Sequence, residues 1–136
     1  FTFAGVGGYS ATKFALEGLS EALALEVAPF GIKVLVVEPG AFRTSFGGAL
    51  QMSAAMPEYK DVVGPVRVGL PGSDGRQPGD PAKAAAAILA ALDADETPLR
   101  LPLGTDAADG VAANLARAQE EFAAWERLSR STDIEE

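Results

Sequence analysis

Two regular segments joined by a short turn most constrain what this chain can fold into. Apolar side chains recur at helical spacing from Tyr9 to about Ala28, and Pro29 to Gly31 then stops this predicted helix. The next run, Ile32 to Val37, is rich in β-branched residues and is interrupted only by Lys33, as is typical of a parallel strand covered on both faces. A helix leading into such a strand predicts an α/β fold with a parallel sheet.

Tyr9 and Lys13 open the predicted helix as the first and last residues of the sequence YSATK. Residues four apart on an α-helix lie on the same face, so the phenol and the ammonium point the same way. A nearby cation stabilises a phenolate, which makes a tyrosine a better proton donor and acceptor near neutral pH. The pair is therefore a candidate acid–base site, although any amphipathic helix can carry both residue types.

The order of segments after this pair resembles a known family. The sequence FALEGLSEALALEVAPFGIKVLVVEPGAFRT carries the helix, the turn and the strand into Pro39 and Gly40. This pattern resembles the C-terminal half of the short-chain dehydrogenase/reductase family, from about Gly5 to Thr44, with weaker similarity beyond. The resemblance implies that residues 1–136 are one partial domain, the C-terminal portion of a Rossmann-like, doubly wound parallel sheet.

Pro39 and Gly40 lie at the carboxyl end of the predicted strand, where parallel α/β sheets bind ligands. Pro-Gly alone is a common turn dipeptide. The resemblance implies that the P-G-x-x-x-T spacing ending at Thr44 forms the nicotinamide side of a site for NAD or NADP. Thr44 would hydrogen-bond the carboxamide, and the backbone of Ala41 to Arg43 would lie along it. The implied cofactor-binding residues are Tyr9, Lys13, Pro39, Gly40, Ala41, Phe42 and Thr44.

The resemblance also implies hydride transfer between a nicotinamide cofactor and a small-molecule carbonyl or alcohol. Tyr9 would exchange a proton with the substrate oxygen, while Lys13 tunes Tyr9 and binds the nicotinamide ribose hydroxyls. The family's glycine-rich fingerprint, the residue that separates NAD from NADP, and its catalytic serine and asparagine would all precede Phe1. We therefore expect an N-terminal part to be missing, and we expect residues 1–136 alone to bind neither NADH nor NADPH and to have no reductase activity. Ser10 and Ser20 do not have the position of the catalytic serine relative to Tyr9.

Composition and charge argue against several other functions. The 136 residues are 48% hydrophobic, which is enough for one packed core. Cysteine and histidine are both absent, so we predict no metal site and no disulfide. A net charge of −8 disfavours nucleic acid and anionic lipid as partners. No apolar run approaches the roughly 20 residues that cross a bilayer, and the expected location is the cytoplasm.

Glycines and prolines interrupt the stretch from Ser45 to Gly79, for which we expect a long loop with a short helix near Gln51 to Met56. Loops of this length are usually functional, and the resemblance implies the substrate-binding loop. Its apolar side chains would either cover a hydrophobic substrate or complete the core. These residues are Phe46, Leu50, Met52, Met56, Tyr59 and Val62.

The last third of the chain predicts a helix, a strand and a second helix. Asp80 is a good N-cap for an alanine-rich helix from Pro81 to about Leu92. Alternating leucines from Leu99 to Leu103, with neighbouring prolines, predict an edge strand. Thr105 or Asp106 is expected to cap the final helix. That helix has an apolar stripe of Val111, Leu115, Ala118, Phe122 and Trp125, expected to be core or a subunit contact.

The predicted helix from Tyr9 to Ala28 carries two stripes of side chains. Its large apolar residues are Phe14, Leu16, Leu19, Leu23 and Val27, with Glu17, Glu21 and Glu26 expected on the polar side. Its small residues are Ala11, Ala15, Gly18 and Ala22, which would let another helix approach closely. The small stripe fits either the domain's own sheet or a subunit interface. The resemblance implies a homo-oligomer, because this helix commonly pairs with its symmetry mate in the family.

Two alternative functions remain open. A non-catalytic structural or dimerisation module would explain why the cofactor-fingerprint half is not seen. Packing alone, however, would not require Tyr9, Lys13 and Thr44 together. An epimerase or dehydratase using the same Tyr-Lys chemistry is the second alternative, but the helix and the Pro-Gly loop follow the dehydrogenase pattern. Neither the substrate nor the choice between NAD and NADP is predicted.

Overall fold

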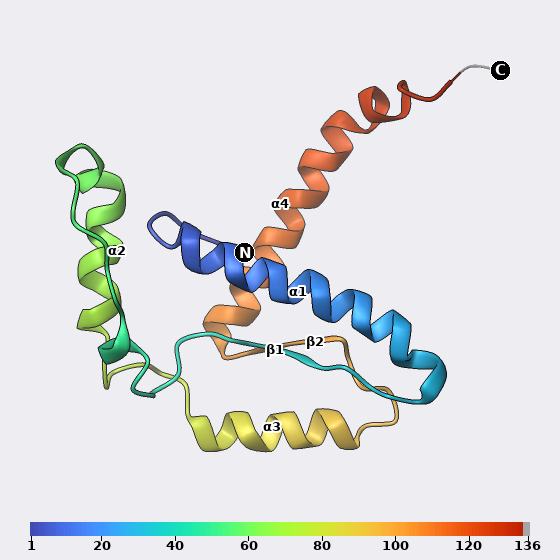
Figure 1. Cartoon of the computed structure of the whole chain (residues 1–136), viewed down its shortest axis with the longest axis horizontal. Coiled ribbons are helices and arrows are strands. Elements are labelled where there is room, and N and C mark those ends of the chain that lie inside the picture. The colour runs from blue at the N-terminus through green and yellow to red at the C-terminus, as the bar shows by residue number, and fades with distance from the viewer. Residues whose placement is uncertain (135–136) are drawn as a thin grey trace.

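A small parallel sheet lies between two helices in the computed structural model, which describes residues 1–134 (Figure 1). The sheet pairs β1 (Val36–Pro39) with β2 (Arg100–Leu103), and it is the only sheet in the described residues. Helix α1 (Gly7–Val27) crosses one face, and α3 (Pro81–Asp93) runs along the other. The predicted α/β class with parallel strands is therefore confirmed.

Two further helices, α2 (Lys60–Gly72) and α4 (Thr105–Arg130), extend away from this centre on different sides (Figure 1). Helix α4 is the long final helix that the apolar stripe predicts. Over the described part of the chain, no helix is both long and apolar enough to cross a membrane.

The strand β1 begins later than the predicted run from Ile32 to Val37, so the predicted bounds are wrong. In the register of the sheet, Val36 lies opposite Arg100 and Pro39 lies opposite Leu103. A strand exists only where a neighbour supplies hydrogen bonds, and β2 is long enough to pair with four residues. Ile32 instead lies 56% exposed before the sheet begins.

The end of α1 follows the predicted signals. The helix runs to Val27 and tightens into a short 3-10 turn at Ala28–Phe30. Gly31 then takes the left-handed conformation, with φ at 72°, and its N–H donates to the Ala28 carbonyl at 3.0 Å. Only glycine adopts that conformation without a steric penalty, so Gly31 ends the helix as predicted.

The orientation of α1 corrects the predicted assignment of its polar side. Arg100, from β2, forms ion pairs with Glu17 at 3.1 Å and Glu21 at 2.9 Å. These two acidic side chains therefore face the sheet side, whereas large apolar residues such as Phe14 and Leu19 are exposed. The physical reason is the arginine, because a cation on the sheet attracts the carboxylates of the helix that crosses it.

The region from Ser45 to Gly79 contains more helix than predicted. Residues 51–56 form no helix, and α2 instead occupies Lys60–Gly72 although Pro65 lies in its interior. An interior proline lacks one helical hydrogen bond and normally breaks a helix. Here the apolar side chains of Val63 and Val66 contact the backbone near Gly5, so tertiary packing favours the helix.

The predicted N-cap is correct for α3 and wrong for α4. The Asp80 carboxylate accepts from the Ala82 N–H at 2.8 Å, so the predicted cap of α3 is confirmed. The predicted cap of α4 is wrong, because its N-cap residue is Gly104, with φ at 93° and no side-chain bond. The carboxylate of Asp106 accepts from the Ala41 N–H instead of capping α4.

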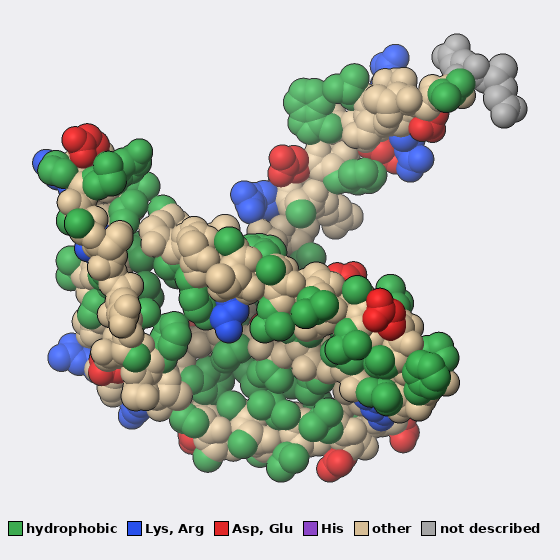
Figure 2. Space-filling model, in the orientation of Figure 1, with side chains coloured by type: hydrophobic (Ala, Val, Ile, Leu, Met, Phe, Trp, Pro, Cys, Tyr) green, Lys and Arg blue, Asp and Glu red, His purple; other side chains and the backbone are tan. Residues whose placement is uncertain are grey.

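The chain buries very little apolar surface. Among the described residues, Leu103 and Ala107 are the buried apolar side chains, and both lie at the junction of β2 with α4. The accessible surface is 10490 Å². A compact protein of this size exposes about 6,700 Å². Figure 2 shows hydrophobic side chains spread over α1 and α3, with a hollow between the two helices.

We expect the 136-residue chain, purified alone, to self-associate and to unfold without a cooperative transition. Each large apolar side chain left in water forfeits about 1.5–3 kcal/mol of burial free energy. A few such losses equal the roughly 5–15 kcal/mol that stabilises a whole domain. Light scattering after size exclusion, together with thermal unfolding, tests this. A monomer with one sharp transition would contradict it.

Candidate functional site

The first turns of α1 bring Tyr9 and Lys13 together. The Lys13 Nζ lies 5.5 Å from the centroid of the Tyr9 ring, within the range of a cation–π interaction. Tyr9 is 52% exposed, and Lys13 is exposed as well. Neither the phenol oxygen nor the ammonium bonds to another of the described residues. Both groups are therefore available to an external ligand.

Lys13 stays unpaired although the chain is acidic. Glu17 lies one helical turn after Lys13 and would be its natural ion-pair partner. Arg100 instead holds Glu17, and also Glu21, from the neighbouring strand. The positive charge beside Tyr9 is therefore not neutralised by its own helix.

Glu38, on β1, adds a third carboxylate to this group. Burial raises the pKa of Glu38 above its ordinary value of 4.5, and the negative charge of Glu17 raises it further, against the opposing effect of Arg100. The four side chains of Glu17, Glu21, Glu38 and Arg100 join α1 to both strands. The sequence contained a signal for them, since Glu38 and Arg100 are charged residues within otherwise apolar strands.

The loop that follows β1 reaches back to Tyr9. The rings of Phe46 and Tyr9 lie 6.1 Å apart, centroid to centroid, at an angle of 57°. Thr44 lies two residues before Phe46, and its N–H donates to the Phe42 carbonyl at 2.9 Å. The Thr44 hydroxyl accepts weakly from the Phe46 N–H at 3.4 Å, which leaves its own hydrogen free to donate. The structure thus brings Phe46, two residues past the predicted loop, close to Tyr9.

One side of this loop is held by the segment before α3. The Gly79 N–H donates to the Ala41 carbonyl at 3.0 Å, and the Arg43 N–H donates to the Gly79 carbonyl at 2.9 Å. A Cβ on Gly79 would lie 2.7 Å from the Phe42 ring, so only glycine fits this close approach. The Arg43 guanidinium also donates to the Gln77 carbonyl at 3.0 Å. Gln77 to Gly79 therefore runs beside the loop like a short strand.

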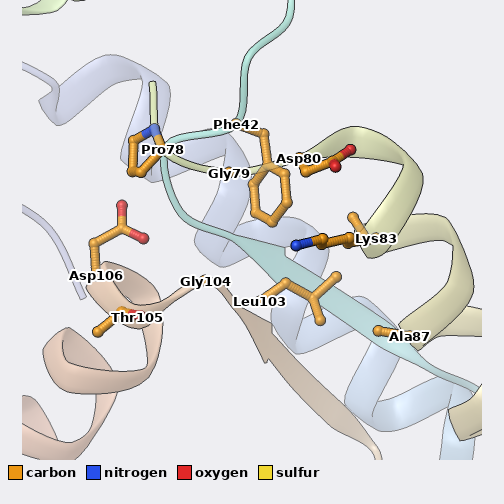
Figure 3. A pocket seen from close by; sticks show the side chains of 11 residues that line it. Phe42, Pro78, Gly79, Asp80, Lys83, Ala87, Leu103, Gly104, Thr105 and Asp106 are labelled. Atoms are coloured by element: carbon orange, nitrogen blue, oxygen red, sulfur yellow. The ribbon is translucent and has the colours of Figure 1, made fainter. Parts of the chain in front are cut away.

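The other side of the loop is held by the junction of β2 with α4. The Gly40 N–H donates to the Leu103 carbonyl at 2.9 Å. The Ala41 N–H donates to the Asp106 carboxylate at 2.7 Å. In Figure 3 this carboxylate points from the first turn of α4 toward the loop. Strand ends in a parallel sheet share one edge, and this is the sequence signal that could have placed Asp106 beside Pro39 and Gly40.

A cavity of about 360 Å³ lies on the α3 side of the loop. Phe42, Lys83, Leu103 and Asp106 are among the residues that line it (Figure 3). Neither Tyr9 nor Lys13 does so. The cavity is therefore behind the loop and is separate from the exposed Tyr-Lys pair.

The donors of this region fit the nicotinamide half of a dinucleotide. A ribose hydroxyl pair needs exposed hydrogen-bonding groups, which the Tyr9 phenol and the Lys13 ammonium supply. A carboxamide needs donors from a loop, and the Thr44 hydroxyl and the Phe42 N–H form no donor bond within residues 1–134. In the same described part of the chain, no group of three or more acidic side chains is arranged to hold a metal ion.

Comparison with known proteins finds similarity to short-chain dehydrogenases. The family model described as short chain dehydrogenase matches residues 1–54. The oxidoreductase BOA17 of Botryotinia fuckeliana is 39% identical over 128 residues, covering 92% of this chain and 46% of that protein. The 3-ketodihydrosphingosine reductase of Bacteroides thetaiotaomicron is 54% identical over 55 residues, covering 40% of this chain and 20% of that protein.

A solved structure extends the likeness to nearly the whole chain. A short-chain dehydrogenase from Streptomyces avermitilis superposes with a TM-score of 0.88 and 58% sequence identity. The match covers 98% of this chain and 48% of the other. The chain belongs to the short-chain dehydrogenase family. It spans about half the length of these full-length relatives.

We expect Glu38→Gln to raise stability at neutral pH and to reduce its pH dependence. A folded-state pKa above the unfolded value means that the folded protein binds the Glu38 proton more tightly. The Glu38 contribution is therefore fully present below the ordinary pKa of 4.5 and is lost as the pH rises through the raised folded value. The gain should be small, within about 0.5 kcal/mol, because the side chain is partly exposed.

The measurement is the midpoint of urea unfolding of the full-length protein, as wild type and as variant, from neutral pH down to the ordinary glutamate pKa. Glu58→Gln is the matched control, because Glu58 is exposed and makes no ion pair within the described residues. A constant difference between Glu38→Gln and wild type across this range would contradict the assignment.

Proposed function

We propose that the protein is an NAD(P)-dependent oxidoreductase acting on a carbonyl or alcohol substrate, with Tyr9 as the acid–base residue. The observation that carries this proposal is the exposed Tyr9 phenol, with the unpaired Lys13 ammonium beside it and Phe46, two residues past the Pro39–Thr44 loop, against its ring. Family membership and the fit of the loop donors support the same reaction class.

The chemistry of Tyr9 follows from its surroundings. The nicotinamide cofactor, when bound, supplies or accepts the hydride. In the direction of reduction, the Tyr9 hydroxyl gives its proton to the substrate oxygen, so that a carbonyl becomes an alcohol. In the direction of oxidation, Tyr9 takes that proton back. The Lys13 ammonium stabilises the phenolate present between these steps, which is why its freedom from Glu17 matters.

The loop after β1 would hold and orient the nicotinamide. The Thr44 hydroxyl and the Phe42 N–H are the donors that would bind its carboxamide. Bonds from Gly79 and Leu103 fix the backbone on both sides, so these donors are set in place before a ligand arrives. Such preorganisation reduces the entropy that binding must overcome.

The side chains near Tyr9 favour an apolar substrate. Phe46 stacks at an angle against Tyr9, and Met56, Tyr59 and Val62 are all more than half exposed in the same region of the chain. These residues cannot complete the core of the chain in this arrangement, so they are available to cover a substrate. The Bacteroides thetaiotaomicron relative is named for the reduction of a ketone, 3-ketodihydrosphingosine. An apolar ketone or the matching alcohol is the proposed substrate class.

Tyr9→Phe is expected to lower turnover at least about 100-fold, because it removes the proton that a general acid supplies. Oxidation of NADH and NADPH by the full-length protein is followed with a panel of apolar ketones. Trp125→Phe is the control, since Trp125 is an aromatic residue of similar exposure, at 61%, but lies on α4 outside the candidate site. Unchanged turnover in Tyr9→Phe would contradict the assignment of Tyr9 as the acid–base residue.

We also propose that the protein forms a homo-oligomer through α1. The small residues Ala11, Ala15, Gly18 and Ala22 are all exposed, so the protein's own sheet does not use this stripe. Small side chains let two helix axes approach closely, and a symmetric contact uses the same stripe from each copy. The likeness to short-chain dehydrogenases, in which this helix commonly pairs with its symmetry mate, supports a subunit interface.

Ala15→Trp should weaken this association. A bulky side chain at a close helix contact costs about 1–3 kcal/mol, which raises a dissociation constant roughly tenfold or more. Sedimentation velocity over a range of concentrations measures the change. Ala116→Trp, on an exposed position of α4 outside its apolar stripe, is the control. Equal effects of the two variants would argue against α1 as the interface.

A further inference from the structure

Asp106 makes a contact that helix formation does not require. Its carboxylate accepts the Ala41 N–H at 2.7 Å, across 65 residues of sequence. Bonds from an N–H to an ionised carboxylate are about twice as strong as those between neutral groups. Aspartate in the first turn of a helix commonly caps that same helix, yet no side-chain cap is present at the start of α4. The Asp106 carboxylate therefore bonds to the loop after β1 instead of to its own helix.

Two glycines make room for this carboxylate. A Cβ on Gly40 would overlap the Asp106 side chain directly. A Cβ on Gly104 would come within 2.8 Å of an Asp106 oxygen, and Gly104 also takes the left-handed conformation with φ at 93°. Glycine at both positions is therefore required by the placement of Asp106, in addition to the usual needs of a turn.

The bond to Asp106 fixes one peptide plane of the loop. With the Ala41 N–H turned toward Asp106 and the Ala41 carbonyl bonded to Gly79, that residue is held from two opposite sides. The next N–H, of Phe42, remains without a partner among the described residues. The Phe42 N–H shares its peptide plane with the Ala41 carbonyl, which Gly79 holds, and Asp106 fixes the adjoining plane that contains the Ala41 N–H.

We propose that Asp106 is a positioning residue that sets the conformation of the Pro39–Thr44 loop and thereby the affinity for the nicotinamide cofactor. The inference rests on the proposed function. Asp106 acts through Ala41 and has no contact with Tyr9, so it affects cofactor binding and leaves proton transfer unchanged. Loss of the carboxylate is expected to raise the KM and Kd for the cofactor about tenfold or more, with kcat within about twofold of wild type.

Three variants test the proposal. Asp106→Ala removes the acceptor, and Asp106→Asn keeps an acceptor oxygen of the same reach. Asp109→Ala is the matched control, because Asp109 is an exposed aspartate one turn further along α4 with no partner in the described residues. All variants are made in the full-length protein; hydrogen exchange of the peptide containing Ala41 is measured without cofactor, and Kd, KM and kcat are measured with NADH and NADPH.

The expected result is faster exchange at Ala41 and weaker cofactor binding in Asp106→Ala, substantial recovery in Asp106→Asn, and no change in Asp109→Ala. Unchanged exchange or unchanged Kd in Asp106→Ala would overturn the proposal. An equal fall in kcat and in thermal stability, without recovery in Asp106→Asn, would also overturn it, because that pattern indicates a merely structural role. Failure of the proposed function is seen separately, as wild-type protein that binds neither cofactor.

A steric test adds a second line of evidence. Gly40→Ala should displace the Asp106 carboxylate and weaken cofactor binding in the wild-type background. In the Asp106→Ala background the obstructing group is gone, so the same change should have little further effect. Non-additivity of this kind reports direct contact. Additive effects of the two changes on Kd would overturn the assignment of Asp106 as the group that Gly40 accommodates.

Discussion

Parallel pairing of β1 with β2 is the constraint on which the candidate site depends. Pro39 lies opposite Leu103, so the two strands end at the same edge of the sheet. The loop after β1 and the first turn of α4 therefore meet, and Gly40 and Ala41 can donate to Leu103 and Asp106. An antiparallel pair would place the two carboxyl ends at opposite edges, and these bonds could not form.

The distribution of charge is the second determinant of the site. In an acidic chain, a lysine on a helix surface would ordinarily pair with the nearest glutamate. Arg100 pairs with both Glu17 and Glu21 from the strand beneath, so its single positive charge is shared by two carboxylates, while Lys13 forms no ion pair with a described residue. The helical spacing places Lys13 beside Tyr9, but Glu17 pairs with Arg100 because of the sheet, which the local Tyr-Lys sequence does not determine.

Local signals predicted the parts of the fold that local chemistry controls. The glycine stop at Gly31 and the Asp80 cap needed only their immediate neighbours, and both were predictable from sequence. The bounds of β1 depended on the length of its partner, and α2 depended on packing of Val63 against a distant glycine, so neither followed from the nearby residues. The contact of Asp106 with Ala41 could not be predicted for the same reason. An aspartate at the start of a helix can cap that helix or bond to a distant loop, and the sequence near Asp106 does not distinguish the two.

The loop after β1 and helix α1, which together form the candidate site, are attached to the sheet by interactions of different strength. The loop is anchored next to Leu103 and Ala107, the buried apolar residues of the described chain, and by several backbone bonds. Helix α1 is tied to the sheet by the ion pairs of Arg100, which are partly exposed and contribute about 0.2–1 kcal/mol each. Any contact that tightens α1 against the sheet therefore changes the position of Tyr9 relative to the loop, while the loop itself is already fixed.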